Sequence, residues 1–238
     1  MNKKQSLGWA LKEFILGVTD MAWPHCCSIC GRTLTETQMR ICLDCMYELP
    51  SIAHHSFKDN RTIERLMGRI AFENAASGFR YEKDSKIQKA IELLKYKGEK
   101  EVGYQLAKMA AHKLHESGFF ETVDYLIPVP LHRSRLKKRG YNQSEWIAKG
   151  LAEVSELEIR TDILKRIKYN PTQTTKNIWK RWENAQGLFE LGNTTLCDEK
   201  HILLVDDVLT SGSTMEACCH VLNQIKGLKI SIFSLALA

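Results

Sequence analysis

The apolar positions of this chain follow two periods in alternation, which predicts strands and helices in turn. Short apolar runs typical of strands occupy residues 76–83, 124–130, 158–166, 201–207 and 229–238. Between these runs apolar residues recur at helical spacing. The predicted helices lie around Ile87, Ala90, Ile91 and Leu94; around Val102, Leu106, Met109 and Ala110; around Trp146, Ile147 and Leu151; and around Met215, Cys218, Leu222 and Ile225, the last stopping at Gly227. Strands alternating with helices predict an α/β domain with a mostly parallel sheet and flanking helices.

The run at 201–207, "HILLVDD", reads as a central strand that is buried on both faces and ends in Asp206 and Asp207. Ligands of parallel sheets bind beyond the carboxyl ends of the strands, so we expect a binding site here. The tight turn that follows opens a helix, and Gly212 lets the backbone approach a ligand closely. Backbone N–H groups at a helix N-terminus bind a phosphate monoester. Hydroxyl groups from the same turn can add donors: Thr210, Ser211, Ser213 and Thr214.

Two acids beside a phosphate loop are better suited to sugar hydroxyls than to the phosphate itself, because carboxylates repel an anion. The stretch therefore favours a 5-phosphoribosyl group over a bare phosphate. The alternative is a strand end whose carboxylates, those of Asp206 and Asp207, only cap the following turn.

Cysteines cluster near the N-terminus as Cys27-x2-Cys30 and Cys42-x2-Cys45. Two such doublets can complete a tetrahedral sulfur site for Zn²⁺, and four thiolates leave no open position, so we predict a structural zinc. Gly31 can supply the positive φ that such a knuckle requires. Two alternatives stay open: Cys26 replaces Cys27, or the segment is a reduced loop without metal.

Composition and charge narrow the class of protein only a little. The chain has 238 residues, of which 44% are hydrophobic and 26% charged, which is typical of globular proteins. The net charge of +6 permits an anionic partner without requiring one. No apolar run approaches the roughly 20 residues that span a bilayer. We therefore expect no membrane span and a cytoplasmic location.

The N-terminal segment has apolar residues at helical spacing: Leu7, Leu11, Phe14, Ile15 and Val18. They predict a short amphipathic helix that packs on the rest of the protein or, as the alternative, anchors at a membrane surface. Residues 51–70 are polar and basic and are predicted to connect two domains. We expect residues 1–60 to form the N-terminal helix, a four-cysteine zinc-ribbon module and its linker, and residues 61–238 to form the main domain.

Taken together and in order, the motifs resemble the ComF family of phosphoribosyltransferase-like competence proteins. The resemblance spans roughly residues 23–238 and rests on the paired cysteine doublets, "IPVPLHRSRLKKRGYNQS", "PTQ" at 171–173, Arg181, Asn184 and the Asp-Asp motif. Ser211 departs from the family, which often has threonine there, but the hydroxyl is kept.

The resemblance implies a type I phosphoribosyltransferase-like fold that binds phosphoribosyl pyrophosphate with Mg²⁺. Asp206 and Asp207 would hold the ribose hydroxyls, and residues 210–214 the 5-phosphate. Pro130, Leu131 and His132 would form the pyrophosphate loop, with Arg133 and Arg135 contacting the diphosphate. Lys95 and Lys97 are further candidates, although a solvated charge run is the alternative for all these cations.

Two functions follow from the resemblance. The first is a phosphoribosyltransferase acting on an acceptor that the sequence does not identify. The second is a non-catalytic protein of natural competence that retains the pocket and works with single-stranded DNA, a competence helicase or recombination proteins. Residues 165–181 carry basic side chains interspersed with aromatic ones. They suit a loop that closes over the substrate, a contact with single-stranded DNA, or a solvated loop.

Overall fold

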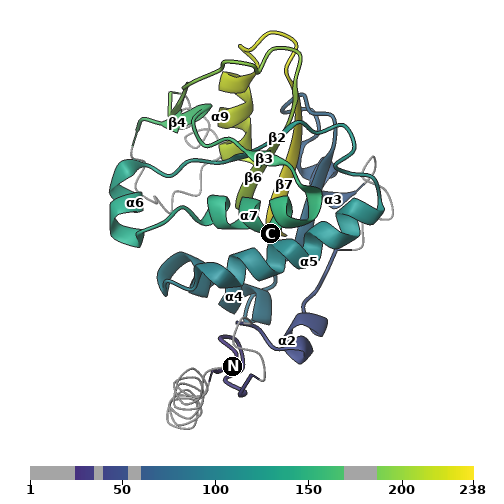
Figure 1. The fold of residues 1–238 in the computed structure, drawn as a ribbon, viewed down its shortest axis with the longest axis vertical. Coiled ribbons are helices and arrows are strands. Elements are labelled where there is room, and N and C mark those ends of the chain that lie inside the picture. Colours follow the sequence, from purple (N-terminus) through teal and green to yellow (C-terminus); the bar gives the residue numbers. More distant parts are fainter. Residues whose placement is uncertain (1–24, 35–39, 53–59, 169–186) are drawn as a thin grey trace, which may run out of the picture.

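The computed structural model describes residues 25–34, 40–52, 60–168 and 187–238. Its centre is a five-stranded sheet in the order β1-β7-β6-β2-β3, and all neighbouring strands run parallel (Figure 1). The strands are β1 (Ala75–Arg80), β2 (Tyr125–Pro128), β3 (Glu158–Ile159), β6 (His201–Leu209) and β7 (Lys229–Leu237). The prediction of an α/β fold with a parallel sheet is confirmed.

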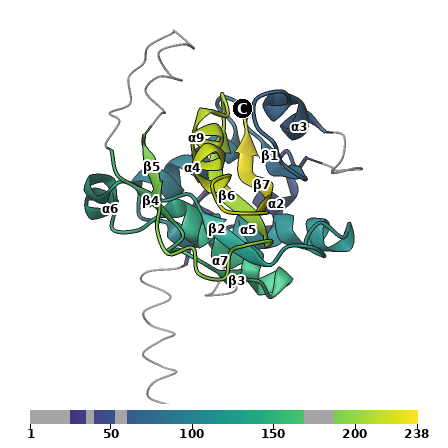
Figure 2. The ribbon, with the colours of Figure 1, turned by 90° about the horizontal axis from the view of Figure 1, so that it is seen from above.

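Helices cover both faces of the sheet, as its buried strands require. Leu203 and Val205 of β6 point into a core shared with helices α4 (Lys86–Tyr96), α5 (Lys100–Glu116) and α7 (Gln143–Ser155). Ile202 and Leu204 point into a second core with α3 (Arg61–Leu66), α9 (Ser213–Leu222) and a hairpin of β4 (Leu164–Arg166) and β5 (Phe189–Leu191). Figure 2 shows α9 and α3 on one side of the sheet and α5 and α7 on the other.

Three of the four predicted apolar stripes lie wholly in helices, and the fourth lies in α9 except for Ile225, which follows that helix. Side-chain caps mark the starts of α4 and α7. The Asn142 side chain caps α7 by accepting from the Ser144 N–H at 3.1 Å, and it donates to the Val129 carbonyl at 3.0 Å. Helices α5 and α7 meet at Gly150, where an added Cβ would lie 2.3 Å from the Tyr104 carbonyl oxygen. This close approach fixes α7, whose first turn reaches the carboxyl edge of the sheet.

Several elements differ from the sequence-based expectation. The segment 158–166 splits between two sheets as β3 and β4. The predicted connection at 51–70 contains α3, which buries Ile63 and Leu66. The basic run after β2 forms α6 (Arg133–Arg139), which has no apolar stripe and buries none of its residues. Helix α9 ends at Leu222, five residues before Gly227, which has a φ of +65° in the turn that follows.

The cysteine segment packs against the main domain. Helix α2 (Leu43–Tyr47) follows Cys42, and Ile41 is fully buried in the core that α4 and α5 share. The Gln105 side chain of α5 accepts from the N–H groups of Arg40 and Ile41 at 2.9 and 3.2 Å. The division at residue 60 stays a prediction, and the two proposed parts share one core.

Some predictions lie outside the described residues: the amphipathic helix within 1–24, and the "PTQ" segment with Arg181 and Asn184. Within the part of the chain that the structure describes, the helices are too short or too polar to cross a membrane.

Candidate functional site

A cavity of about 580 Å³ opens at the carboxyl edge of the sheet, where β2 and β6 end. Its size is typical of small-molecule sites. Segments far apart in the sequence meet around it, because the carboxyl ends of parallel strands share one edge. The polar residues of its wall are Tyr81, Glu92, Lys95, Tyr96, Arg135, Arg139, Gln143, Ser144, Arg166, Asp206, Asp207, Thr210 and Thr214.

Asp207 is held inside the wall of this cavity. Its side chain is 8% exposed, and it pairs with Lys95 Nζ at 2.8 Å. Gln143 Nε2 donates to its second oxygen at 2.7 Å. Burial lowers the pKa of Lys95, but the charges of Asp207 and Asp206 outweigh it and raise that pKa overall. The carboxylate is therefore balanced by one cation while it still faces the cavity.

Asp206 is surrounded by hydrogen-bond donors that carry no charge. Ser144 Oγ donates to its Oδ1 at 3.1 Å, and the Asp207 N–H donates to the same oxygen at 2.8 Å. Burial, and then the charge of Asp207, raises the pKa of Asp206 to about 7. This carboxyl group therefore changes its charge near neutral pH, where a bound ligand can determine whether it is protonated or ionised.

The turn after β6 leads directly into a helix, as the sequence predicts, but the strand continues to Leu209, two residues beyond the predicted end at Asp207. Gly212 is buried with a φ of +78° and stands immediately before α9, which starts at Ser213. Ser211 Oγ and Ser213 Oγ are 3.0 Å apart. The N–H groups of the first turn of α9 have no partner within the helix, so this turn can bind an anion. Thr210 and Thr214 line the cavity.

Cationic side chains form another part of the cavity wall. Arg135 and Arg139 come from the same face of α6, four positions apart, and Arg166 comes from β4. Burial, and then the like charge of Arg135, lowers the pKa of Arg166. Of all buried side-chain nitrogen and oxygen atoms in the described residues, Arg166 Nε alone lacks a hydrogen-bond partner. A buried donor without an acceptor is typical of a site that receives an anion.

The structure brings together part of the predicted site. Eight predicted residues line the cavity: Lys95, Pro130, Leu131, Arg135, Asp206, Asp207, Thr210 and Thr214. Six do not: Lys97, His132, Arg133, Ser211, Gly212 and Ser213. Arg133 is exposed on α6, and the His132 side chain caps that helix by accepting from the Ser134 N–H at 3.3 Å. Gly212 and its neighbours form the backbone of the turn instead.

Sequence reasoning did not assign Gln143, Ser144 or Arg166 to the site. A usable signal existed for the first two, since they begin the helix that crosses over from β2. In a parallel sheet the first turn of such a helix lies at the carboxyl edge, so its polar residues are candidates. Arg166 was included only as part of the basic segment 165–181, and its place in the cavity wall depends on how the hairpin of β4 and β5 packs beside α9.

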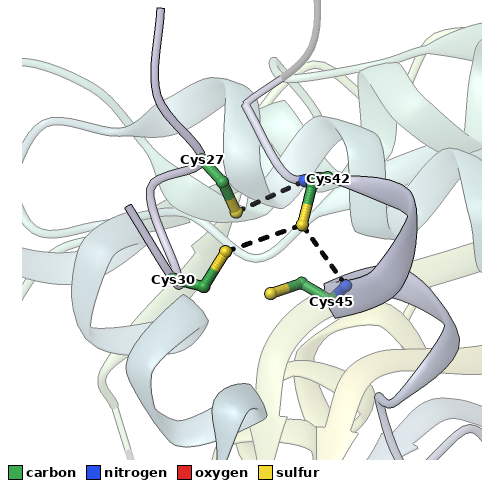
Figure 3. A group of neighbouring side chains, drawn as sticks. All are labelled: Cys27, Cys30, Cys42 and Cys45. Carbon is green, nitrogen blue, oxygen red and sulfur yellow. Dashed lines mark hydrogen bonds between the residues drawn. The ribbon is translucent and has the colours of Figure 1, made fainter. Parts of the chain in front are cut away.

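The second candidate site is the cysteine cluster. The Sγ atoms of Cys27, Cys30, Cys42 and Cys45 all lie within 4.8 Å of one another (Figure 3). Tetrahedral zinc with Zn–S bonds of about 2.3 Å would place the sulfurs about 3.8 Å apart. Cys30 Sγ and Cys42 Sγ are 3.6 Å apart. Cys26 is exposed and pairs with Thr33 through a backbone bridge, so Cys27 is the fourth member of the cluster.

Backbone N–H groups point at these sulfur atoms. The Cys42 N–H donates to Cys27 Sγ at 3.3 Å, and the Cys45 N–H donates to Cys42 Sγ at 3.5 Å. Burial raises the pKa of Cys27, but the Cys42 N–H and further hydrogen bonds from Cys30 and Ile29 lower it to about 6 overall. Burial and the neighbouring sulfurs raise the pKa of Cys45 to about 12. A metal cation would stabilise all four thiolates together, so the cluster can hold a metal.

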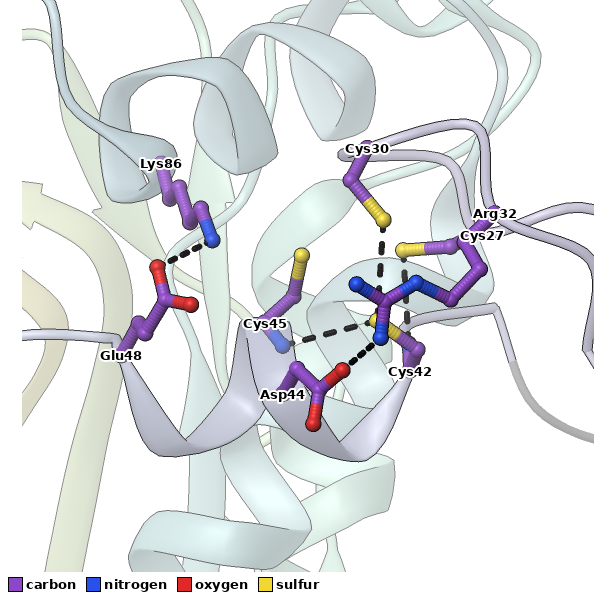
Figure 4. Close-up of polar contacts among 8 residues, drawn as sticks. All are labelled: Cys27, Cys30, Arg32, Cys42, Asp44, Cys45, Glu48 and Lys86. Atoms are coloured by element: carbon purple, nitrogen blue, oxygen red, sulfur yellow. Dashed lines mark hydrogen bonds and ion pairs between the residues drawn. The ribbon is translucent and has the colours of Figure 1, made fainter.

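Ion pairs join the ends of this segment to its surroundings (Figure 4). Arg32, which follows the first doublet, pairs with Asp44 of α2. Glu48, which follows α2, pairs with Lys86 at the start of α4. The ion pairs bind the two doublets to each other and to the sheet domain. Because most of these side chains are more than half exposed, each pair contributes little to stability by itself.

The chain matches one protein-family model and is similar in sequence to several known proteins. The family model described as "Phosphoribosyl transferase domain" matches residues 100–237. Competence protein F of Haemophilus influenzae is 31% identical over 56% of this chain, and the match spans only 57% of that protein's length. The DNA utilization protein YhgH of Salmonella typhimurium is 25% identical, over 82% of this chain and 83% of that protein. Competence protein ComFC of Bacillus subtilis is 24% identical, over 89% and 77%.

The Lys95–Asp207 pair yields a stability prediction. Lys95→Met should lower the free energy of unfolding by about 3 kcal/mol at pH 8, because it leaves a buried carboxylate without its cation. Lys95 stays charged below the usual lysine pKa, so the lysine itself adds no pH dependence between about 6 and 8. The loss should shrink at about pH 6, where Asp206 takes up a proton. Urea unfolding at both pH values measures the effect.

The matched control is Lys97→Met, two positions away at an exposed site, which should change the free energy of unfolding by less than about 0.5 kcal/mol. Equal losses in the two variants would show that the buried ion pair does not stabilise the cavity wall.

Proposed function

Because this chain belongs to the phosphoribosyl transferase domain family, and within it to the ComF group, we propose that its cavity binds phosphoribosyl pyrophosphate with Mg²⁺ in a protein that serves DNA uptake during natural competence. One observation carries the proposal. Two acids and the phosphate-type turn that follows them line one cavity together with arginines from two other segments, α6 and β4. The names of the relatives, competence proteins and a DNA utilization protein, support the competence role.

Each part of the ligand has a chemical counterpart in the cavity. The turn at residues 210–214 suits the 5-phosphate, through backbone N–H groups and the hydroxyls of Thr210 and Thr214. Asp206 and Asp207 suit the ribose hydroxyls as acceptors. The diphosphate, at the other end of the sugar, suits the segment after β2 and the forked donors of Arg135. This arrangement gives donors to the two anionic ends of the ligand and acceptors to its hydroxylated middle.

Mg²⁺ would arrive with the diphosphate as part of the substrate. The carboxylate oxygens of the cavity are hard donors of the kind that Mg²⁺ prefers, so the residues present fit it. When bound, the ion neutralises charge that develops on pyrophosphate. The arginines of the wall add to that stabilisation, which in such sites amounts to several kcal/mol.

Catalysis and binding without turnover are the two forms of the proposal. In a transferase, the bond from C1 to the pyrophosphate oxygen breaks, pyrophosphate leaves with the electron pair, and an acceptor nucleophile supplies the new pair to C1. In a competence protein without turnover, the same pocket would report on the ligand while the basic surface of α6 attracts single-stranded DNA. The exposed side chains of α6 include Lys137 and Lys138, which supports the form that binds single-stranded DNA.

Calorimetric titration with phosphoribosyl pyrophosphate and Mg²⁺ tests the proposal. The direction in which affinity changes with pH follows from Asp206. Because its pKa is raised to about 7, its carboxyl group is mostly protonated in the free protein below about pH 7. A carboxylate that accepts from hydroxyls must be ionised, so binding should release a proton. The affinity should rise about tenfold from about pH 6 to about pH 8 beyond the ligand's own titration.

Asp206→Asn should bind more weakly at about pH 8 and should retain only the pH dependence of the ligand phosphates. The exposed Asp198→Asn is the matched control and should behave as wild type. Absence of binding by the wild-type protein would contradict the proposal. Adding acceptors and a single-stranded oligonucleotide to the same experiment separates its two forms: pyrophosphate release indicates turnover, and coupled binding without release indicates the DNA-related role.

We further propose that the cysteine cluster holds a structural Zn²⁺. The support is chemical: four sulfur ligands at tetrahedral spacing, three of them buried, with N–H donors to two of the sulfurs. A closed set of four thiolates leaves no position for a substrate, so the ion would stabilise the fold and take no part in chemistry.

Cys45→Ser should abolish stoichiometric zinc and lower the thermal midpoint by about 10 °C, because the loss of a buried ligand costs several kcal/mol in a domain of this size. Cys26→Ser changes an exposed cysteine beside the cluster and should leave both properties unchanged. Elemental analysis and calorimetric unfolding measure the two effects. A full zinc complement in Cys45→Ser would overturn the assignment.

A further inference from the structure

The turn that follows β6 is braced from behind by two arginines of the α3 region. Arg65 Nη1 donates to the Thr210 carbonyl at 3.2 Å. Arg69 donates through Nη1 to the Ser211 carbonyl and through Nη2 to Glu216 Oε2 at 2.5 Å. Neither arginine lines the cavity. Both therefore contact the turn without being part of the cavity wall, and we expect them to act on a ligand through the turn.

These arginines extend from a fixed platform. Asn60 caps α3, accepting from the Thr62 N–H at 2.9 Å, and donates to the Ala75 carbonyl of β1 at 2.9 Å. Thr62 Oγ1 donates to Ser77 Oγ at 2.9 Å, and Ser77 Oγ lies 2.7 Å from Ser234 Oγ. This buried chain of hydroxyls ties α3 to β1 and β7. The position of Arg65 in α3 is thereby set by the sheet, and Arg69 is joined to the end of α3 by its N–H, which donates to the Leu66 carbonyl at 3.2 Å.

Holding the carbonyls determines where the neighbouring N–H groups point. In a planar trans peptide the C=O and the following N–H are directed oppositely. Because the arginines hold the carbonyls of Thr210 and Ser211, the N–H groups of Ser211 and Gly212 are directed away from Arg65 and Arg69. An added Cβ on Gly212 would lie 3.0 Å from Leu66 and 3.2 Å from Arg69, which shows how closely this platform approaches the turn.

Arg69 also removes an unfavourable charge. Glu216 lies in the first turn of α9, the same turn whose N–H groups would bind a phosphate. A free carboxylate in that turn would repel the anion. Its side chain is 20% exposed, and the contact with Arg69 neutralises it.

We propose that Arg69, assisted by Arg65, is a positioning residue for the phosphate-binding turn: it aims the N–H groups of the turn at the ligand and cancels the charge of Glu216. The inference rests on the proposed function, since it assigns the 5-phosphate to this turn. It also gives residues 60–69 a role in ligand affinity, although none of them touches the ligand.

The test compares Arg69→Met with Arg80→Met, which alters an arginine whose ion pair with Glu82 is about half exposed. Arg69→Met should weaken the binding of phosphoribosyl pyrophosphate and of ribose 5-phosphate at least tenfold. Pyrophosphate alone should bind with unchanged affinity, because it occupies the Arg135 side of the cavity. Arg80→Met should bind all three as wild type does. A general loss of folding in Arg69→Met would instead weaken the binding of all three ligands to the same extent.

Charge rescue separates the two effects of Arg69. Adding Glu216→Gln to Arg69→Met should recover several-fold of the lost affinity, since the repulsion disappears while the turn stays unbraced. Hydrogen exchange of residues 209–216 in the unliganded protein supplies a readout that needs no ligand. It should be faster in Arg69→Met and unchanged in Arg80→Met.

The outcomes distinguish this inference from the proposed function. If the wild-type protein binds and Arg69→Met binds equally well, the positioning role is wrong while the proposed function stands. If the wild-type protein does not bind, the proposed function fails, and hydrogen exchange still decides whether Arg69 braces the turn. Unchanged exchange in Arg69→Met would overturn the inference in either case.

Discussion

The central position of β6 is the constraint on which the rest of the structure depends. It is hydrogen-bonded to β2 on one edge and to β7 on the other, and its residues from His201 to Val205 are buried. Its pairing with β2 stops at Val205, whereas its pairing with β7 continues to Leu209. Asp206 and Asp207 therefore lie just beyond the end of β2, close to the turn that follows Leu209. The alternation of side chains then directs Asp207 toward α4 and α7 and gives Asp206 a different environment.

Electrostatic balance makes this edge of the sheet suited to bind a ligand. A carboxylate pair at the end of a buried strand is unfavourable unless cations, donors or protons compensate it. The protein uses all three. Lys95 balances Asp207, Ser144 and backbone N–H groups bond Asp206, and Asp206 keeps a pKa near neutrality. The wall also carries the positive charges of Arg135, Arg139 and Arg166, which suit a ligand with anionic ends and a hydroxylated middle.

Local signals in the sequence predicted the sheet, the main helices and the cysteine cluster, because periodicity and ligand spacing are local properties. They did not predict α3, which is short and has only Ile63 and Leu66 as apolar positions, or α6, which is charged and lacks an apolar stripe. Missing α6 had a direct consequence for the site. Arg133 and Arg135 are two positions apart, about 200° around a helix axis, so only one of them can face the cavity. Arg135 and Arg139 are four apart and share a face. The contact between Arg69 and the Ser211 carbonyl depends on tertiary packing between segments far apart in the sequence, so no local sequence pattern predicts it.

The central claim is that acids at the end of β6 hold sugar hydroxyls while the adjoining turn holds the sugar phosphate. Calorimetry at about pH 8 with ribose 5-phosphate and 2-deoxyribose 5-phosphate tests it most directly, since the two ligands differ only in one hydroxyl. The account predicts that the deoxy sugar binds at least about tenfold more weakly, because a carboxylate loses a donor that it was placed to receive. Equal affinities for the two sugars would contradict it.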